Sequence, residues 1–307
     1  MKATPLARNK SSAFDSITMR LVVYCEGSTD EFALQLLSRI PSVPGLEVHV
    51  IGGSEPRNCK NLYVCVIRSA HGIQSSVNRL SAAETQSAQV LLTKCGPGNV
   101  CEVLARYCTR IAANLIIVAM TPGGGVRRWW SASLPERLAY HFPVLAIPAE
   151  DSSGPFGMDR CLRWLVPLDG SGFAEAILNP LRSLATWLPS SITLLQPLAF
   201  AGLWRERVGR NHVAAVSKMG PSIADSCDYL AKLAERGFGD SPTRVCCATD
   251  SDAVRSIIRL ANSSAIDAVA IGLSNRWRIT RVLAAELNEL LLRSLRKPVL
   301  LFGSASG

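Results

Sequence analysis

Three consecutive glycines with two arginines close behind them are the residues of this sequence best suited to binding phosphate. The glycines at 123–125 follow the apolar run 114–119 (NLIIVA), and Arg127 and Arg128 come next. Glycine lets backbone N–H groups approach an anion closely, and the guanidinium of arginine can donate to two phosphate oxygens. A loop of this kind after a buried strand predicts a site for a nucleotide or another phosphate ligand.

A second basic loop lies nearer the end of the chain. There Arg276, Arg278 and Arg281 follow the apolar run 267–272 (DAVAIG). The arginines of both loops could contact phosphate, or they could be solvated charges that pair with neighbouring acids. Tryptophans accompany both loops, and their rings could cover a sheet edge or stack on a base.

Catalytic and metal-binding patterns are missing from the sequence. It has no C-x-x-C pair, and its four histidines are not at helical spacing from one another, which argues against a metal site. Walker and G-x-S-x-G motifs are also absent. Cys25, at the end of the first apolar run, is the one candidate nucleophile that could face a cleft. We predict no catalytic residues and no metal ligands, with weak nucleotide or thiol-dependent hydrolysis as the enzymatic alternative.

The composition indicates a globular protein of a reducing compartment. Apolar residues make up 48% and charged residues 19% of the chain, and no apolar run approaches the roughly 18 residues that span a bilayer. The net charge is +9, but the arginines are scattered, so nucleic-acid binding is not expected as the main function. Several of the ten cysteines lie inside apolar runs, as buried reduced thiols do, which favours the cytoplasm.

Two segments of the chain occur twice in the same order, which predicts a duplicated unit. The segment from Arg20 (RLVVYCEGSTDEF) resembles the segment from Arg163 (RWLVPLDGSGFAE), and Glu26 aligns with Asp169. Each segment is an apolar strand, an acid, Gly-Ser and an amphipathic helix. The runs NLIIVA and DAVAIG align in the same way, with a loop insertion in the second unit.

Strands and helices are predicted to alternate in each unit, as in a doubly wound α/β fold with a mostly parallel five-stranded sheet. In the second unit we expect strands at 163–168, 191–198, 243–248, 266–272 and 297–303, and helices at 172–188, 222–237, 251–264 and 279–295. Ser251 is the expected N-cap of the third of these helices, with Asp252 in its first turn. The expected organisation is a flexible tail over 1–17, a first domain over 18–148, a linker over 149–158 and a second domain over 159–307.

This repeated pattern resembles the universal stress protein family in a tandem two-domain form. The resemblance covers nearly the whole chain and includes the opening strand and helix (RWLVPLDGSGFAEAIL), the third helix with the fourth strand (SDAVRSIIRLANSSAIDAVAIG) and the final strands (FPVLAIP and KPVLLFG). It implies two Rossmann-like domains related by an internal pseudo-two-fold. These would form an intramolecular pseudo-dimer through their final strands, with a further homodimer or an unknown protein partner and no membrane.

Family members that bind ATP carry the pattern G-x2-G-x9-G-[ST] after the fourth strand. In the first unit the resemblance places this pattern on Ala119, Pro122, Ala132 and Ser133. All three glycines are replaced, and a proline has no N–H to donate to phosphate.

In the second unit the same pattern falls on Gly272, Asn275, Ala285 and Glu286. A carboxylate in place of the serine would repel a triphosphate. The acid after the first strand, which is Glu26 in one unit and Asp169 in the other, would hold the adenosine end of a nucleotide or cap the following helix.

The resemblance implies a non-catalytic stress-response or regulatory protein without ordinary ATP binding and without a cofactor. The alternative is a universal stress protein that binds ATP or another phosphate ligand in one cleft, with weak or no hydrolysis. A regulatory module for a different small anion or a protein partner is a third possibility. The candidate ligand-binding residues are Glu26, Arg127, Arg128, Ser133, Asp169, Gly272, Asn275, Arg276 and Glu286.

Overall fold

The structure is a computed structural model that describes residues 19–26, 45–53, 62–68, 100–120, 134–148, 161–198, 222–238, 241–249, 252–273, 295 and 297–303. The expected tail over 1–17, the expected linker over 149–158 and most of the expected helix over 279–295 lie outside these residues. No helix within the described ranges is long and apolar enough to cross a membrane.

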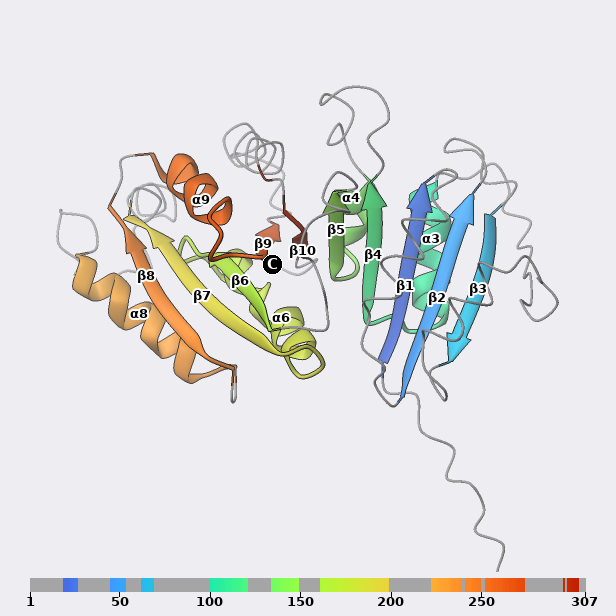
Figure 1. Ribbon diagram of the computed structural model, residues 1–307, viewed down its shortest axis with the longest axis horizontal. Helices are drawn as coiled ribbons and strands as arrows, with labels where there is room; N and C mark the ends of the chain where they lie inside the picture. The colour runs from blue at the N-terminus through green and yellow to red at the C-terminus, as the bar shows by residue number, and fades with distance from the viewer. Residues whose placement is uncertain are drawn as a thin grey trace, which may run out of the picture.

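Strands and helices follow one another along the described chain (Figure 1). The strands are β1 (Met19–Glu26), β2 (Leu46–Gly53), β3 (Leu62–Arg68), β4 (Leu115–Met120), β5 (Val144–Pro148), β6 (Leu162–Pro167), β7 (Ser190–Pro197), β8 (Thr243–Ala248), β9 (Ala268–Leu273) and β10 (Val299–Gly303). The helices are α3 (Val100–Arg110), α4 (Leu134–Ala139), α5 (Gly172–Glu175), α6 (Leu178–Ala185), α8 (Ile223–Glu235) and α9 (Ala253–Ala261). The fold is therefore mixed α/β, as predicted.

All ten of these strands belong to one sheet, in the order β3-β2-β1-β4-β5-β10-β9-β6-β7-β8. Read from the centre outward, the order β5, β4, β1, β2, β3 of the first half corresponds to β10, β9, β6, β7, β8 of the second. The neighbours are parallel except at two places, the β5–β10 pair and the β2–β3 pair. The sheet is mostly parallel, as expected, but its two halves are continuous.

The antiparallel β2–β3 pair has no counterpart in the second half, where β7 and β8 are parallel. A parallel pair needs a crossover of about a dozen residues or more, and the connection over 54–61 is too short for that. Between β7 and β8 the chain has room for α8. The length of the connection therefore explains why the outer strands of the two halves run differently.

Helices cover both faces of the sheet and divide its core in two. Ala174 of α5, Leu181 of α6 and Leu230 of α8 pack on one face, around the fully buried Trp164. Leu104 of α3, Leu138 of α4 and Ile257 of α9 pack on the other face. Strands covered on both faces need continuous apolar runs, which is why β4, β6 and β9 could be recognised in the sequence.

An equivalent contact occurs in both halves of the sheet. In the first half, the backbone N–H of Arg20 donates to Oδ1 of Asn114 over 2.8 Å. In the second half, the backbone N–H of Arg163 donates to Oδ2 of Asp267 over 3.1 Å. The two pairs occupy matching positions of the repeated segments, so segments that were aligned separately in the sequence lie in the same spatial relation.

The two halves meet where β5 pairs with β10. Leu145 lies opposite Leu300 in this pair, and both side chains are fully buried. At the end of β10, a Cβ on Gly303 would stand 2.6 Å from Cδ1 of Tyr140, which follows α4. The last strand of the second half is therefore packed against both a strand and a helix end of the first half.

Two local expectations need correction. The helix expected over 172–188 is divided into α5 and α6, because Pro180 has no N–H for the hydrogen bond to residue 176 and its ring would clash with that carbonyl. At the start of α9, the N-cap is Asp252 and not Ser251: Oδ1 of Asp252 accepts from the backbone N–H of Arg255 over 3.0 Å. Ser251 itself lies outside the described residues.

Candidate functional site

The carboxyl end of β6 leads into a tight turn that holds Asp169, the acid predicted after the first strand of the second unit. Gly170 has a φ of +86°, a left-handed conformation that favours glycine. Oδ1 of Asp169 accepts from the backbone N–H of Ser171 over 2.8 Å, and Oγ of Ser171 accepts from the N–H of Ala174 over 3.1 Å. Ser171 is therefore the N-cap of α5, while Asp169 braces the turn that presents it.

Gly272 lies beside the same helix. A Cβ at this position would stand 2.4 Å from the carbonyl oxygen of Phe173, and 2.8 and 2.9 Å from the carbonyl oxygen and Cα of Ala174. These neighbours are backbone atoms of α5, which cannot move aside as a flexible side chain could. The absence of a side chain at Gly272 thus lets α5 lie directly on β9. Glycine has the same role between helix and strand in Rossmann-like folds.

A buried amide that the sequence analysis did not single out borders this turn. Gln196, near the end of β7, is 5% exposed, and its Oε1 has no hydrogen-bond donor within the part of the chain described here. Its Nε2 lies 3.7 Å from the point where a Cβ on Gly170 would be. A buried oxygen without a donor is costly, and it indicates a place for a water molecule or a ligand. The signal in the sequence was a single polar residue inside an apolar run, LLQPL.

A half-buried tyrosine of α8 makes a hydrogen bond to α5 next to this turn. The Oη of Tyr229 donates to Oε1 of Glu175 over 2.8 Å. Burial, and then this hydrogen bond, raise the pKa of Tyr229 well above its ordinary value, and the charges of Glu175 and Asp169 add to the rise. Negative charge therefore gathers beside the turn, which disfavours an anionic ligand there.

Within the described ranges, two of the predicted site residues lie next to the start of α5: Asp169 accepts from the N–H of its N-cap Ser171, and Gly272 packs against the backbone of its first turn. The backbone of Glu26 ends β1, where Glu26 pairs with Gly53 of β2, but its side chain is not described. The other predicted residues lie outside the described ranges; they are Arg127, Arg128, Ser133, Asn275, Arg276 and Glu286. Their roles stay predictions.

A pocket of about 330 Å³ lies at the opposite edge of the sheet, at the amino ends of β6, β7 and β8. Leu165, Val245 and Leu260 form apolar walls, and Thr193 and Arg244 supply polar groups. The sequence did not predict this pocket, because ligands of doubly wound sheets bind at the carboxyl ends of the strands. No group of three or more metal-ligating side chains occurs in the described segments.

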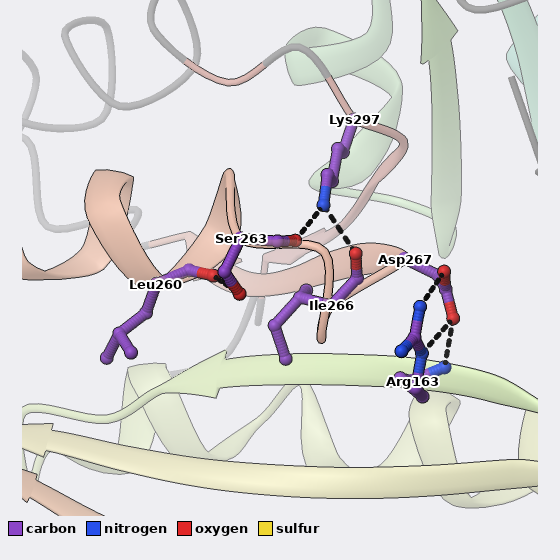
Figure 2. A network of polar contacts seen from close by, with 6 residues as sticks. All are labelled: Arg163, Leu260, Ser263, Ile266, Asp267 and Lys297. Carbon is purple, nitrogen blue, oxygen red and sulfur yellow. Dashed lines mark hydrogen bonds and ion pairs between the residues drawn. The ribbon is translucent and has the colours of Figure 1, made fainter.

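Figure 2 shows a network of polar contacts that includes three residues lining this pocket, Arg163, Ser263 and Ile266. Nε and Nη2 of Arg163 each donate to one carboxylate oxygen of Asp267 over 2.8 Å, and these hydrogen bonds raise the pKa of Arg163. Nζ of Lys297 donates to the carbonyl oxygens of Ser263 and Ile266, in the turn between α9 and β9. A cation at the carboxyl end of a helix is favourable for the helix dipole. The network therefore holds the α9–β9 turn against β6.

Solved structures share this fold along nearly the whole chain. A universal stress protein from Archaeoglobus fulgidus is 14% identical, with a TM-score of 0.55, and the match covers 93% of this chain and 97% of that one. A putative universal stress protein from Pseudomonas aeruginosa UCBPP-PA14 is 14% identical with a TM-score of 0.52, covering 92% of each chain. A functionally unknown protein from Pseudomonas aeruginosa PAO1 is 15% identical with a TM-score of 0.55, covering 96% and 95%.

No protein-family model matches the chain, and no curated protein matches it either. At the identities of the solved structures, the likeness is one of fold. The predicted resemblance to universal stress proteins is confirmed at that level.

Proposed function

We propose that this chain is a regulatory protein of the universal stress type that carries out no catalysis and does not bind ATP in the ordinary way. Its two repeated units would form an internal pseudo-dimer, and a protein partner would bind to this pseudo-dimer. The fold shared with universal stress proteins and the β5–β10 pair support this assignment. The cytoplasm is the compartment that the buried thiols favour.

The observation that carries the proposal is the set of hydrogen bonds and packing contacts made by the turn after β6. The residues of this turn and of the strand beside it are engaged in the fold: Asp169 braces the turn, Ser171 caps α5, and Gly272 gives α5 its place on β9. Negative charge from Asp169 and Glu175 lies beside them. Together with the glycines lost from both loop patterns, this arrangement supports a cleft that has kept its shape and lost its phosphate donors.

Calorimetric titration of the full chain with Mg-ATP tests this proposal. We expect no saturable heat up to roughly 1 mM ligand, which corresponds to a binding free energy weaker than about −4 kcal/mol. The matched variant is Asp169→Asn, which keeps an oxygen for the N–H of Ser171 and removes the charge. Binding in the micromolar range would contradict the proposal, and Arg127→Ala and Arg276→Ala would then show which loop holds the phosphates.

A second candidate function, binding of a small polar ligand or nucleotide in the second cleft alone, is favoured by Gln196. Its buried oxygen without a described donor suits a ligand N–H or O–H group at the adenosine end of the cleft. The test is to release bound small molecules from the purified protein and identify them by mass spectrometry. In this case we expect Gln196→Met to lose the ligand that the unmodified protein retains, whereas equal recovery from both proteins would exclude Gln196 as a ligand contact.

A further inference from the structure

Two thiols touch each other where α8 packs on the last strand of the sheet. Sγ of Cys227, in α8, lies 3.3 Å from Sγ of Cys247, in β8. Both side chains are half-buried, so a small molecule can reach them. Neither the proposed function nor the fold gives this pair a task.

The neighbouring thiol of Cys246 does not share this contact. Side chains of a strand alternate between its two faces. Cys247 packs with the core that α8 covers, whereas Cys246 packs with the opposite core, under α9. The strand therefore aims one of two adjacent cysteines at Cys227 and turns the other away.

The two sulfurs lie close to each other, at 3.3 Å. A disulfide needs its sulfurs about 2.0 Å apart, so the two sulfurs would have to approach each other by roughly 1.3 Å. We propose that Cys227 and Cys247 are an oxidation site that reacts with a hydroperoxide to form a reversible disulfide within the chain.

The reaction balances with one hydroperoxide molecule. Cys227 gives up its proton and its thiolate attacks one oxygen of the peroxide. The S–O bond forms, the O–O bond breaks, and Cys227 becomes a sulfenic acid; in the case of hydrogen peroxide the released hydroxide takes up that proton and leaves as water. The thiol of Cys247 then attacks the sulfenic sulfur; the S–S bond forms, the S–O bond breaks, and the hydroxyl leaves with the thiol proton as water. Two electrons pass from the two thiols to the peroxide.

Burial of Cys247 disfavours it as the first thiol to react. Burial, together with the hydrogen bond to Cys227, raises the pKa of Cys247 to about 12, so that this thiol stays protonated. Since the thiolate is the nucleophile, Cys247 is disfavoured as the first thiol to react, which leaves the attack on the peroxide to Cys227.

The disulfide would tie the edge of the sheet to its covering helix. β8 is the last strand in the sheet order, and Val245 within it is 42% exposed. Two residues after Cys227, Tyr229 donates to Glu175 of α5, the helix that lies on Gly272. A bond at Cys227 therefore restrains the helix that contacts the turn after β6.

Peptide mapping of the full chain tests the proposal without any substitution. The reduced protein is exposed to hydrogen peroxide, its free thiols are alkylated, and it is digested after lysine and arginine. We expect the peptide 219–232, which contains Cys227, to be linked to the peptide 245–255, with the loss of two hydrogen atoms and recovery of both peptides by dithiothreitol. If peptide 219–232 is recovered unlinked, carrying a free or irreversibly oxidised Cys227, the proposal is overturned.

Three variants identify the sulfurs, because Cys246 and Cys247 lie in the same peptide. Cys246→Ser is the matched control and should keep the linkage at the level of the unmodified protein. Cys227→Ser and Cys247→Ser should each abolish it. If the linkage is lost in Cys246→Ser and retained in Cys247→Ser, Cys246 is the partner of Cys227, and the proposed pairing is overturned.

Discussion

Replacing Gly272 with alanine is expected to lower the free energy of unfolding by about 3 kcal/mol, the upper part of the range for overpacked cores. The added Cβ would stand 2.4 Å from the carbonyl oxygen of Phe173 and 2.9 Å from Cα of Ala174. Only a shift of α5 away from β9 can relieve contacts of this kind. That shift would also pull on the turn of Asp169 and Ser171.

The control for this substitution is Gly172→Ala, three residues after Asp169 in the same turn. A Cβ on Gly172 would meet no atom within 4 Å, and the residue begins α5. Alanine there should be neutral or should stabilise by about 0.5 kcal/mol, since it restricts the unfolded chain. Urea denaturation of both variants makes the comparison; equal losses would show that close approach of α5 to β9 is not the reason for glycine at 272.

Gly272 also shows how far the sequence could be interpreted. Its place at the end of an apolar run located the end of β9 to within one residue, because a strand covered on both faces must be apolar along its length. The family pattern then pointed to a phosphate loop, while the described contacts of this glycine are with the backbone of α5. Glycine is required in both situations for the same reason, close approach of another group, and the sequence does not tell which group approaches.

Some features that the sequence analysis did not predict have a local cause, and others depend on contacts between distant segments. β3 was not identified in the sequence, and it runs antiparallel to β2 because the connection between them is short. The break before α6 is caused by a single proline inside an amphipathic pattern. The bond from Tyr229 to Glu175 and the thiol contact of Cys227 with Cys247 join elements that meet only after the sheet is assembled. The periodicity of apolar residues indicates which side of a helix or strand is buried. It does not indicate which polar atoms of two packed elements come into contact.

The repeated contact at the amino ends of the strands leads to a second stability prediction, for Asp267. This carboxylate accepts from the backbone N–H of Arg163 and from two guanidinium nitrogens, and its side chain is 4% exposed. Asp267→Ala removes all three bonds and leaves the part-buried N–H of Arg163 without this acceptor. We expect a loss of about 2–3 kcal/mol, as for hydrogen bonds to charged groups. The loss stays below that of a fully buried ion pair, because the side chain of Arg163 is 42% exposed and can be rehydrated.

The first half of the chain supplies the matched variant, since Asn114 holds the N–H of Arg20 without a charge. Asp267→Asn keeps the acceptor for the N–H of Arg163 and removes the ion pair, so about 1 kcal/mol should be lost. The free energies of unfolding of the two variants in urea separate the contributions of backbone bond and charge. If the asparagine variant is as unstable as the alanine variant, the ion pair carries the stability, and the equivalence of Asn114 and Asp267 is one of position alone. If the asparagine variant keeps most of the stability, the shared backbone bond is what both halves of the sheet require at this point, and the charge is an addition of the second half.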